Sequence, residues 1–216
     1  VVSAIARARQ VVLVGDASRP GSGIVNDLVG TLPTVPLPTD RVRRQEHLAS
    51  FLAGAGHGDA AEVPSPPSPS SIRLHLVDGV GETTLGGIAV EGTPSEVAEV
   101  LRLVREHIAD GTESVAVISL SDVTAERIAA EIAADPELRA IDSSRLVVTG
   151  VEDARGLVRN TVILSVGFGK TPHGRVIHRF GAISTPDGLV LLTDALDAVR
   201  ENLEIVSAHA PGAQER

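Results

Sequence analysis

The stretch SVAVISLSDVTAERIAAEIAADP, residues 114–136, decides the fold of this chain. Its first seven residues, 114–120, are mostly apolar and of strand length, which predicts a buried strand. Ser121 follows directly as a helix cap, and the helix that it opens must end before Pro136. A further strand is predicted at 145–149, and a strand–helix–strand unit of this size implies two parallel strands joined by a crossover.

The same alternation continues on both sides of that unit. Another helix is predicted from Thr93, with Pro94 in its first turn and Glu96 at the spacing of a capping box. Further strands are predicted at 72–77, 161–166 and 203–207, and a helix within 189–200. The pattern therefore predicts a doubly wound α/β domain, in which ligands bind beyond the carboxyl ends of the strands.

The amino-terminal third has a weaker pattern. It predicts strands at 11–14 and 34–37, helices at 24–29 and 45–52, and an exposed Pro/Ser-rich loop insertion at 57–71. We expect residues 1–36 to be the end of a preceding domain or the first strand of the same sheet, residues 37–210 to form the main domain, and residues 211–216 to be a disordered tail. Because the chain begins with Val1 rather than Met, we interpret it as a fragment of a longer protein.

The composition excludes several classes of protein. The chain lacks Cys, Met, Trp and Tyr and has three Phe, so its core must consist of Val, Leu, Ile and Ala, which suit parallel strands covered on both faces. Without Cys there is no disulfide and no thiolate metal site, which is compatible with the cytoplasm. Because no apolar run is long enough to cross a membrane, we expect no membrane partner. The net charge of −9 argues against a nucleic-acid binder that acts alone, although not against one domain of a larger machine.

Motifs of sites that work alone are absent or degenerate. The closest histidine pair, His173 and His178, lacks the zinc-binding His-Glu-x-x-His pattern, and the chain has no Gly-x-Ser-x-Gly elbow. The residues 169–171, GKT, look like the end of a phosphate-binding loop, but Leu164 stands where the first Gly belongs and Pro172 follows. We interpret this segment as a loop that leaves a strand.

Four segments, taken together and in this order, resemble the later motifs of superfamily 1 helicases, in the branch of the RNA-decay helicases and their large bacterial relatives. Residues 11–20 resemble motif III, 37–41 motif IV, 151–165 motif V and 191–200 motif VI. The motif V likeness, VEDARGLVRNTVILS, is the most specific because its spacing is preserved without a gap. The resemblance implies the second RecA-like domain of a helicase motor, with the P-loop NTPase type of mainly parallel sheet and helices on both faces.

The resemblance also implies site residues and partners. In a cleft shared with a first RecA-like domain, which would bring ATP and Mg²⁺, the nucleotide-binding residues would be Asp16, Arg19, Arg41, Arg155, Gly156 and Arg200. DNA or RNA, bound weakly, would contact Ser119, Ser165, Lys170 and Thr171. Arginine suits the phosphate role because it stays charged and can donate two hydrogen bonds.

Several polar residues of the motifs are replaced. Ala198 stands where the family has an arginine finger, a residue worth about 10³–10⁵ in rate, whereas Arg19 and Arg155 stand where it has Gln. Two hypotheses follow: the parent is an ATP-dependent helicase in which this chain is inactive alone, or the chain is a non-catalytic pseudo-helicase module that binds proteins or nucleic acid. An unrelated sugar- or cofactor-binding α/β protein is a third alternative.

Overall fold

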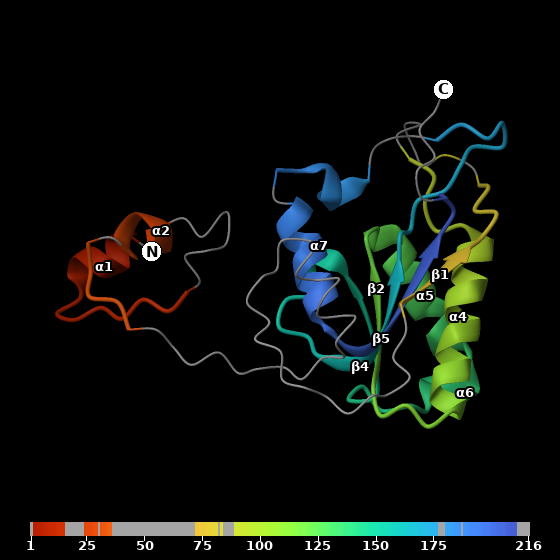
Figure 1. The fold of residues 1–216 in the computed structure, drawn as a ribbon, viewed down its shortest axis with the longest axis horizontal. Coiled ribbons are helices and arrows are strands. Elements are labelled where there is room, and N and C mark those ends of the chain that lie inside the picture. Colours follow the sequence, from red (N-terminus) through yellow and green to blue (C-terminus); the bar gives the residue numbers. More distant parts are fainter. Residues whose placement is uncertain are drawn as a thin grey trace. The chain divides into compact units, whose positions relative to one another are not determined.

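A computed structural model gives the fold, and it describes residues 2–15, 24–29, 31–35, 72–81, 83, 89–176, 180–186 and 188–210. The chain divides into two compact units, Val1–Asp40 and Arg41–Arg216 (Figure 1). Asp16, Arg19 and Arg41 lie outside the described residues, as do the predicted helix at 45–52 and the predicted insertion at 57–71.

The first unit contains two short helices, α1 (Val2–Arg7) and α2 (Ile24–Val29). The predicted helix at 24–29 is confirmed. The predicted buried strand at 11–14 is wrong, since these residues are irregular and the side chains of Val12 and Val14 are 78% and 75% exposed. A strand needs a neighbouring strand to pair its backbone groups, and the described part of this unit contains none. Thr34 and Val35 are likewise not in a strand, which contradicts the first half of the strand predicted at 34–37.

The second unit is built on a five-stranded parallel sheet in the order β1-β5-β4-β2-β3. Its strands are β1 (Ile72–Leu76), β2 (Val115–Ser119), β3 (Leu146–Gly150), β4 (Arg159–Ser165) and β5 (Val199–Ser207). All five predicted strands are confirmed, with differences of one to four residues at their ends. The central strands carry apolar residues throughout because they are covered on both faces, whereas β1 was predicted from its alternation. The predicted α/β fold, with a mainly parallel sheet and helices on both faces, is therefore confirmed.

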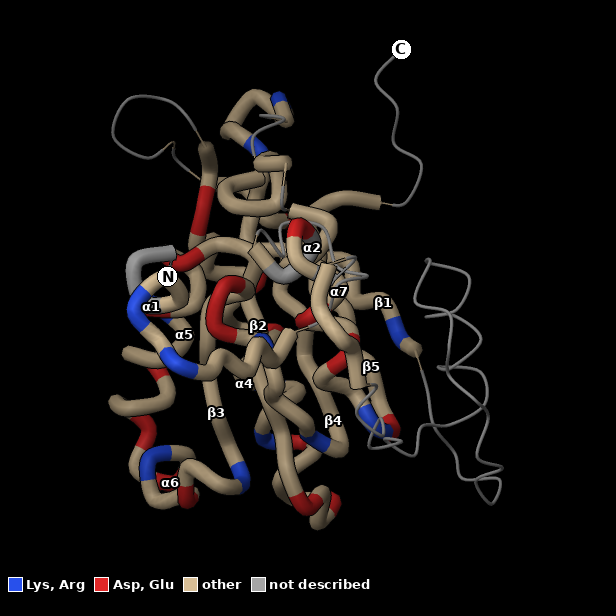
Figure 2. Tube along the Cα trace, turned by 90° about the vertical axis from the view of Figure 1, so that its left-hand side faces the viewer, with Lys and Arg blue, Asp and Glu red and all other residues tan. Residues whose placement is uncertain are grey.

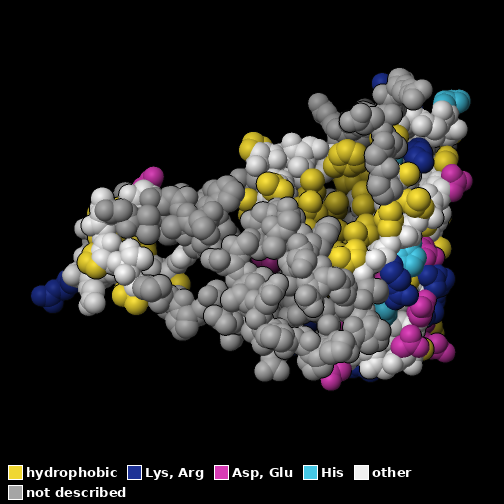
Figure 3. Space-filling model, in the orientation of Figure 1, with side chains coloured by type: hydrophobic (Ala, Val, Ile, Leu, Met, Phe, Trp, Pro, Cys, Tyr) yellow, Lys and Arg dark blue, Asp and Glu magenta, His cyan; other side chains and the backbone are white. Residues whose placement is uncertain are grey.

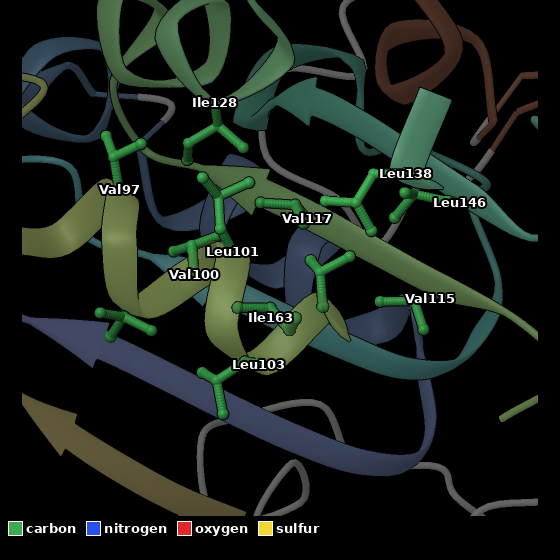
Figure 4. Packing of buried hydrophobic residues seen from close by; sticks show 12 residues of the cluster. Val97, Val100, Leu101, Leu103, Val115, Val117, Ile128, Leu138, Leu146 and Ile163 are labelled. Atoms are coloured by element: carbon green, nitrogen blue, oxygen red, sulfur yellow. The ribbon is translucent and has the colours of Figure 1, made fainter. Parts of the chain in front are cut away.

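One face of this sheet is covered by the helices that connect β1, β2 and β3 along the chain. They are α4 (Pro94–Ala109), α5 (Asp122–Ala134) and the short α6 (Pro136–Arg139). Ser121 accepts a hydrogen bond from the backbone N–H of Thr124 and so caps α5 as predicted. Figure 4 shows the core of this face, in which side chains of α4 and α5 meet β2 and β4; the members include Val97, Val100, Leu101, Val115, Val117, Ile128 and Ile163.

The opposite face is covered by later segments. They are the 3-10 turns η1 (Val151–Asp153) and η2 (Gly181–Ser184), and the helix α7 (Gly188–Asp197). The core of this face takes the alternate residues of β2 and β4 together with residues of α7 and η1; they include Ala116, Ile118, Val162, Leu164, Val151, Ala195 and Leu196. The alternation of β2 between the two cores establishes that the sheet is covered on both faces.

The edge strand β1 differs from the other strands because its apolar side chains are partly exposed and no described helix covers them. Ile72, Leu74 and Leu76 are 36%, 43% and 56% exposed. Figure 3 shows apolar side chains gathered in this part of the second unit. Among the described residues, no helix is long and apolar enough to cross a membrane.

Candidate functional site

The carboxyl ends of β2 and β4 meet at the point of the sheet where ligands of open α/β folds bind. The two strands are neighbours, and Ser119 pairs in register with Ser165. After β2 the chain continues through α5 to β3, whereas after β4 it continues in the opposite direction, through α7 to β5. Such a divergence is a topological switch point, the place at which open α/β folds commonly bind ligands.

Ser119 and Ser165 are brought together here, but both are buried in the protein. The hydroxyl of Ser165 donates a 2.8 Å hydrogen bond to Oε1 of Glu96, and the hydroxyl of Ser119 accepts one of 3.2 Å from the backbone N–H of Ser121. Each serine is 0% exposed. Contact of these hydroxyls with nucleic acid therefore requires the loops above them to move, and their predicted role stays a prediction.

Glu96 is the buried carboxyl group of this site. Its Oε1 accepts hydrogen bonds from the hydroxyl of Ser165 and, at 2.7 Å, from the backbone N–H of Gly167. Burial raises the pKa of Glu96, and the hydrogen bonds from Gly167 and Ser165 only partly oppose it. Its Oε2 has no hydrogen-bond partner among the described residues, nor has Oγ1 of Thr93.

The capping box predicted at the start of α4 does not form, because neither side chain makes its capping hydrogen bond. Thr93 is the N-cap residue of α4, as expected, but its side chain makes no capping hydrogen bond. Glu96 reaches across to the end of β4 instead of back to the cap. The first turn of α4 thus positions an acid at the switch point.

A second set of hydrogen bonds fastens the loop before α4 to the start of α5. Thr124 is central, because its hydroxyl accepts from the N–H of Gly92 at 2.8 Å and donates to the carbonyl of Gly167 at 2.9 Å. Ser121 donates to Glu91 at 2.8 Å, and Arg127 donates to the carbonyl of Gly92. Sequence reasoning did not single out Glu91 or Thr124, since no local motif marks either residue.

The loop after β4 cannot act as a phosphate-binding loop in this conformation. The backbone N–H groups of Gly169, Lys170 and Thr171 donate to the carbonyls of Val90, Gly79 and Arg175, at 2.8, 2.8 and 3.0 Å. A phosphate cradle needs free N–H groups and a helix N-terminus, whereas residues 171–176 form a turn and a bridge. The interpretation of 169–171 as a loop leaving a strand is confirmed.

The remaining predicted nucleotide-binding residues lie elsewhere. Arg155 and Gly156 occupy an exposed turn between η1 and β4, where Gly156 has a φ of +76°. Arg200 is the exposed second residue of β5, near the amino end of the strand, whereas Ser119 and Ser165 lie at carboxyl ends. The second unit alone therefore does not gather Arg200 with these serines. Figure 2 shows its basic residues spread over several elements rather than gathered on one.

Ala198, at the position where the resemblance expects an arginine finger, is fully buried. It belongs to the core on the α7 face, and its carbonyl accepts a 2.8 Å hydrogen bond from the N–H of Arg159. An arginine side chain here would enter the core rather than a cleft. The helix predicted within 189–200 is confirmed as α7, but it ends at Asp197, one residue before this position.

A second polar cluster surrounds Glu204 of β5, which pairs in register with Ile163, two residues before Ser165. This buried carboxylate accepts hydrogen bonds from Nε of Arg73 at 2.9 Å and pairs with Nε2 of His75 at 2.8 Å and Nε2 of His107 at 3.1 Å. Burial alone would raise the pKa of Glu204, but the contacts with His107, His75 and Arg73 outweigh it and lower the pKa to about 2. The cluster joins β1, β5 and α4, and within the described ranges no group of three or more His, Asp or Glu is suited to hold a metal ion.

This chain is similar to known proteins in structure and not in sequence. No protein-family model matches the chain, and no curated protein sequence matches it. Among solved structures, the chain is similar to the C-terminal domain of a possible DNA helicase from Lactobacillus plantarum WCFS1. The TM-score is 0.44 at 12% sequence identity, and the match covers 76% of this chain and 86% of that one.

Proposed function

We propose that this chain is the C-terminal RecA-like motor domain of an ATP-dependent superfamily 1 helicase. The observation that carries the proposal is the agreement between the motif V likeness and the local fold. Residues 151–165 run from η1 through an exposed turn into β4, and end at Ser165 beside the switch point. That is where a residue that couples nucleotide to nucleic acid would be needed.

The nucleotide would be held between this chain and a separate domain that brings Walker A and Walker B. Arg155 and Arg200 support this proposal because both are exposed and neither forms an ion pair with a described residue. Unpaired guanidinium groups on a surface are available to phosphate oxygens of a nucleotide bound by a neighbour. Asp16, Arg19, Arg41 and Gly156 complete the proposed set, and ATP and Mg²⁺ would bind through the partner domain.

The non-catalytic alternative, a pseudo-helicase module, is favoured by one specific observation. Ala198 is buried in the core, so the place of the arginine finger presents no side chain to a nucleotide. A parent with this domain could keep the architecture of the motor and bind partners without turning over ATP.

The test is nucleic-acid-stimulated ATP turnover by the full-length parent protein. We expect turnover, and a loss of at least tenfold in Arg155→Ala or Arg200→Ala, with Arg41→Ala beside them, because each would remove a charge from the phosphates; an arginine finger is worth about 10³–10⁵. Arg139→Ala is the matched control, since Arg139 is an exposed arginine of α6 that lies outside all four motif likenesses. A parent without turnover would contradict the motor proposal and favour the pseudo-helicase alternative.

The isolated chain is expected to hydrolyse no ATP, because the N–H groups of its loop at 169–171 are already paired. Steady-state phosphate release by the purified chain measures this. Hydrolysis that disappears in Lys170→Ala would contradict it.

A further inference from the structure

The motif V and motif VI likenesses, 151–165 and 191–200, meet where β4 and β5 begin. Arg159, the first residue of β4, pairs in register with Val199, the first residue of β5. The backbone N–H of Arg159 donates a 2.8 Å hydrogen bond to the carbonyl of Ala198, which directly precedes β5. Arg159 is therefore the immediate neighbour of the position at which the resemblance expects an arginine finger.

The guanidinium of Arg159 is not satisfied by the residues around it. Its Nε is buried and has no hydrogen-bond partner among the described residues, which is true of no other arginine that the structure describes. Nη1 donates at 2.8 Å to the carbonyl of Val158, the preceding residue. Glu201 of β5 accepts a 2.9 Å hydrogen bond from Nδ2 of Asn160, and no ion pair links Arg159 to a carboxylate of the described residues.

A buried donor without an acceptor is costly, because it has lost its water and gained nothing in return. A phosphate group supplies the acceptors that are lacking here. Its oxygens accept two parallel hydrogen bonds from one guanidinium, which stays charged when buried. Ala198 has no side chain that reaches a ligand, so an arginine that takes over the role of a finger must come from a neighbouring position.

Arg155 and Arg200 fit this role less well. Both are exposed, so water satisfies their N–H groups in the chain alone and neither requires an acceptor from a ligand. Because successive side chains of a strand alternate between the two faces, Arg200 also points away from the α7 face, to which Val199 belongs. The buried Nε distinguishes Arg159 from both of them.

We infer that Arg159 takes the role of the arginine finger and contacts the γ-phosphate of the nucleotide held between this chain and its partner domain. The inference rests on the proposed function and deepens it, because it names the residue that stabilises the transferred phosphoryl group. In that reaction water attacks the γ-phosphorus, the bond from this phosphorus to the oxygen that bridges to the β-phosphate breaks, and ADP, inorganic phosphate and a proton released to solvent are formed. The guanidinium donates hydrogen bonds to the γ-phosphate oxygens, where charge develops, and is itself unchanged.

The first experiment measures the stability of the isolated chain by urea unfolding. Arg159→Met keeps an unbranched apolar stem and removes the unsatisfied donor, so its midpoint of unfolding should be at least as high as that of the unmodified chain. Arg145→Met is the matched control, because Arg145 precedes β3 at the same end of the parallel sheet, is exposed, and also donates to a backbone carbonyl, that of Thr112. Its midpoint should stay unchanged.

The second experiment measures ATP turnover and nucleotide binding by the full-length parent. Arg159→Met should lower kcat by about 10³-fold and change KM little, because a finger acts in the transition state. Arg159→Lys should restore part of the loss, since an ammonium group supplies the charge but not two parallel donors. ADP with aluminium fluoride, which mimics the phosphoryl group in transit, should bind Arg159→Met at least about tenfold more weakly, whereas ADP alone should bind as before. Arg145→Met should match the parent in each measurement.

Three results would overturn the inference: a clearly lower midpoint of unfolding for Arg159→Met in the isolated chain, turnover of Arg159→Met equal to that of the parent, or a loss of ADP binding as large as that with aluminium fluoride. The first would make Arg159 a structural residue, and the last a residue that binds nucleotide equally in the ground state. A parent that hydrolyses ATP equally well with and without Arg159 keeps the motor and loses this finger. A parent without turnover contradicts the motor proposal itself, and the inference with it.

Discussion

The hydroxyl of Ser165, the last residue of β4, donates a 2.8 Å hydrogen bond to Oε1 of Glu96, in the first turn of α4. The two residues are 69 positions apart in the sequence, and both are fully buried. The same oxygen accepts the N–H of Gly167, so one carboxyl group fixes both the end of β4 and the loop that follows. The other oxygen of this group, Oε2, lacks a partner among the described residues, which makes the ionised form costly.

We expect Glu96→Gln to be at least as stable as the unmodified chain at pH 8. The amide oxygen can accept both hydrogen bonds, and the substitution removes a buried charge. Burial raises the pKa of Glu96 in the folded protein above its ordinary value of 4.5. Such a carboxyl stabilises the fold at pH values below 4.5, and this stabilisation is lost as the pH rises through the pKa of the folded state. The gain of Glu96→Gln in the free energy of unfolding should therefore shrink as the pH is lowered toward 4.5, which urea titrations at several pH values measure.

The control for that substitution is Glu152→Gln, at an exposed carboxyl of η1, which should change stability little at any pH. If Glu96→Gln were destabilising by the same amount at pH 5 and pH 8, ionisation of Glu96 would not oppose folding.

Glu204→Gln should act in the opposite direction. Removal of the charge leaves Arg73 and the two histidines without this carboxylate, and because the side chain of Arg73 is about half exposed we expect a cost of about 1–3 kcal/mol, that of unsatisfied buried polar groups. Because the pKa of Glu204 is lowered to about 2, its contribution is complete above the ordinary value of 4.5 and is lost as the pH falls toward 2. Urea unfolding should show the full difference at neutral pH and a shrinking one below pH 4.5. Equal stability of Glu204→Gln and the unmodified chain at pH 7 would show that the cluster does not stabilise β1. The control is Glu137→Gln, at an exposed carboxyl of α6.

The sequence predicted the sheet well and the polar contacts poorly, for a physical reason. Strands such as β2 and β4 are buried on both faces, so their own residues carry the signal. Residues 11–14 carry the same apolar signal but form no strand, because pairing depends on a partner that the described part of the first unit does not contain. Glu96 has the spacing of a local cap, whereas its partner Ser165 is brought near only by the folded sheet. Local patterns therefore predicted the edge of the sheet at which the candidate site lies, but they did not predict that Glu96 is the buried carboxyl group there.

Close packing of the loop after β4 predicts the effect of Gly169→Ala. A Cβ at this position would lie 2.6 Å from Cγ2 of Thr93 and closer still to the backbone carbonyl of Gly79, which cannot rotate away. We expect a loss of about 1–3 kcal/mol in the free energy of unfolding, typical of an overpacked interior, and faster hydrogen exchange at the N–H of Lys170. Gly174→Ala is the control that introduces backbone strain without crowding, because Gly174 has a φ of +76° and open space around it. In this variant, hydrogen exchange at the N–H of Lys170 should stay slow. Wild-type stability of Gly169→Ala would mean that the loop is not packed against Gly79.

Ala198→Arg, which places an arginine where the helicase resemblance expects a finger, should unfold the domain. Ala198 is fully buried among the apolar residues of the α7 face, so the substituted guanidinium would enter the core without a partner. Uncompensated burial of a charge costs several kcal/mol, a large part of the 5–15 kcal/mol that typically stabilises a domain. Thermal unfolding followed by circular dichroism should show a large loss for Ala198→Arg and little change for Ser143→Arg, which adds the same side chain at an exposed position. If Ala198→Arg keeps the stability of the unmodified chain, its side chain has reached the surface, and position 198 can serve as the place of a finger after all.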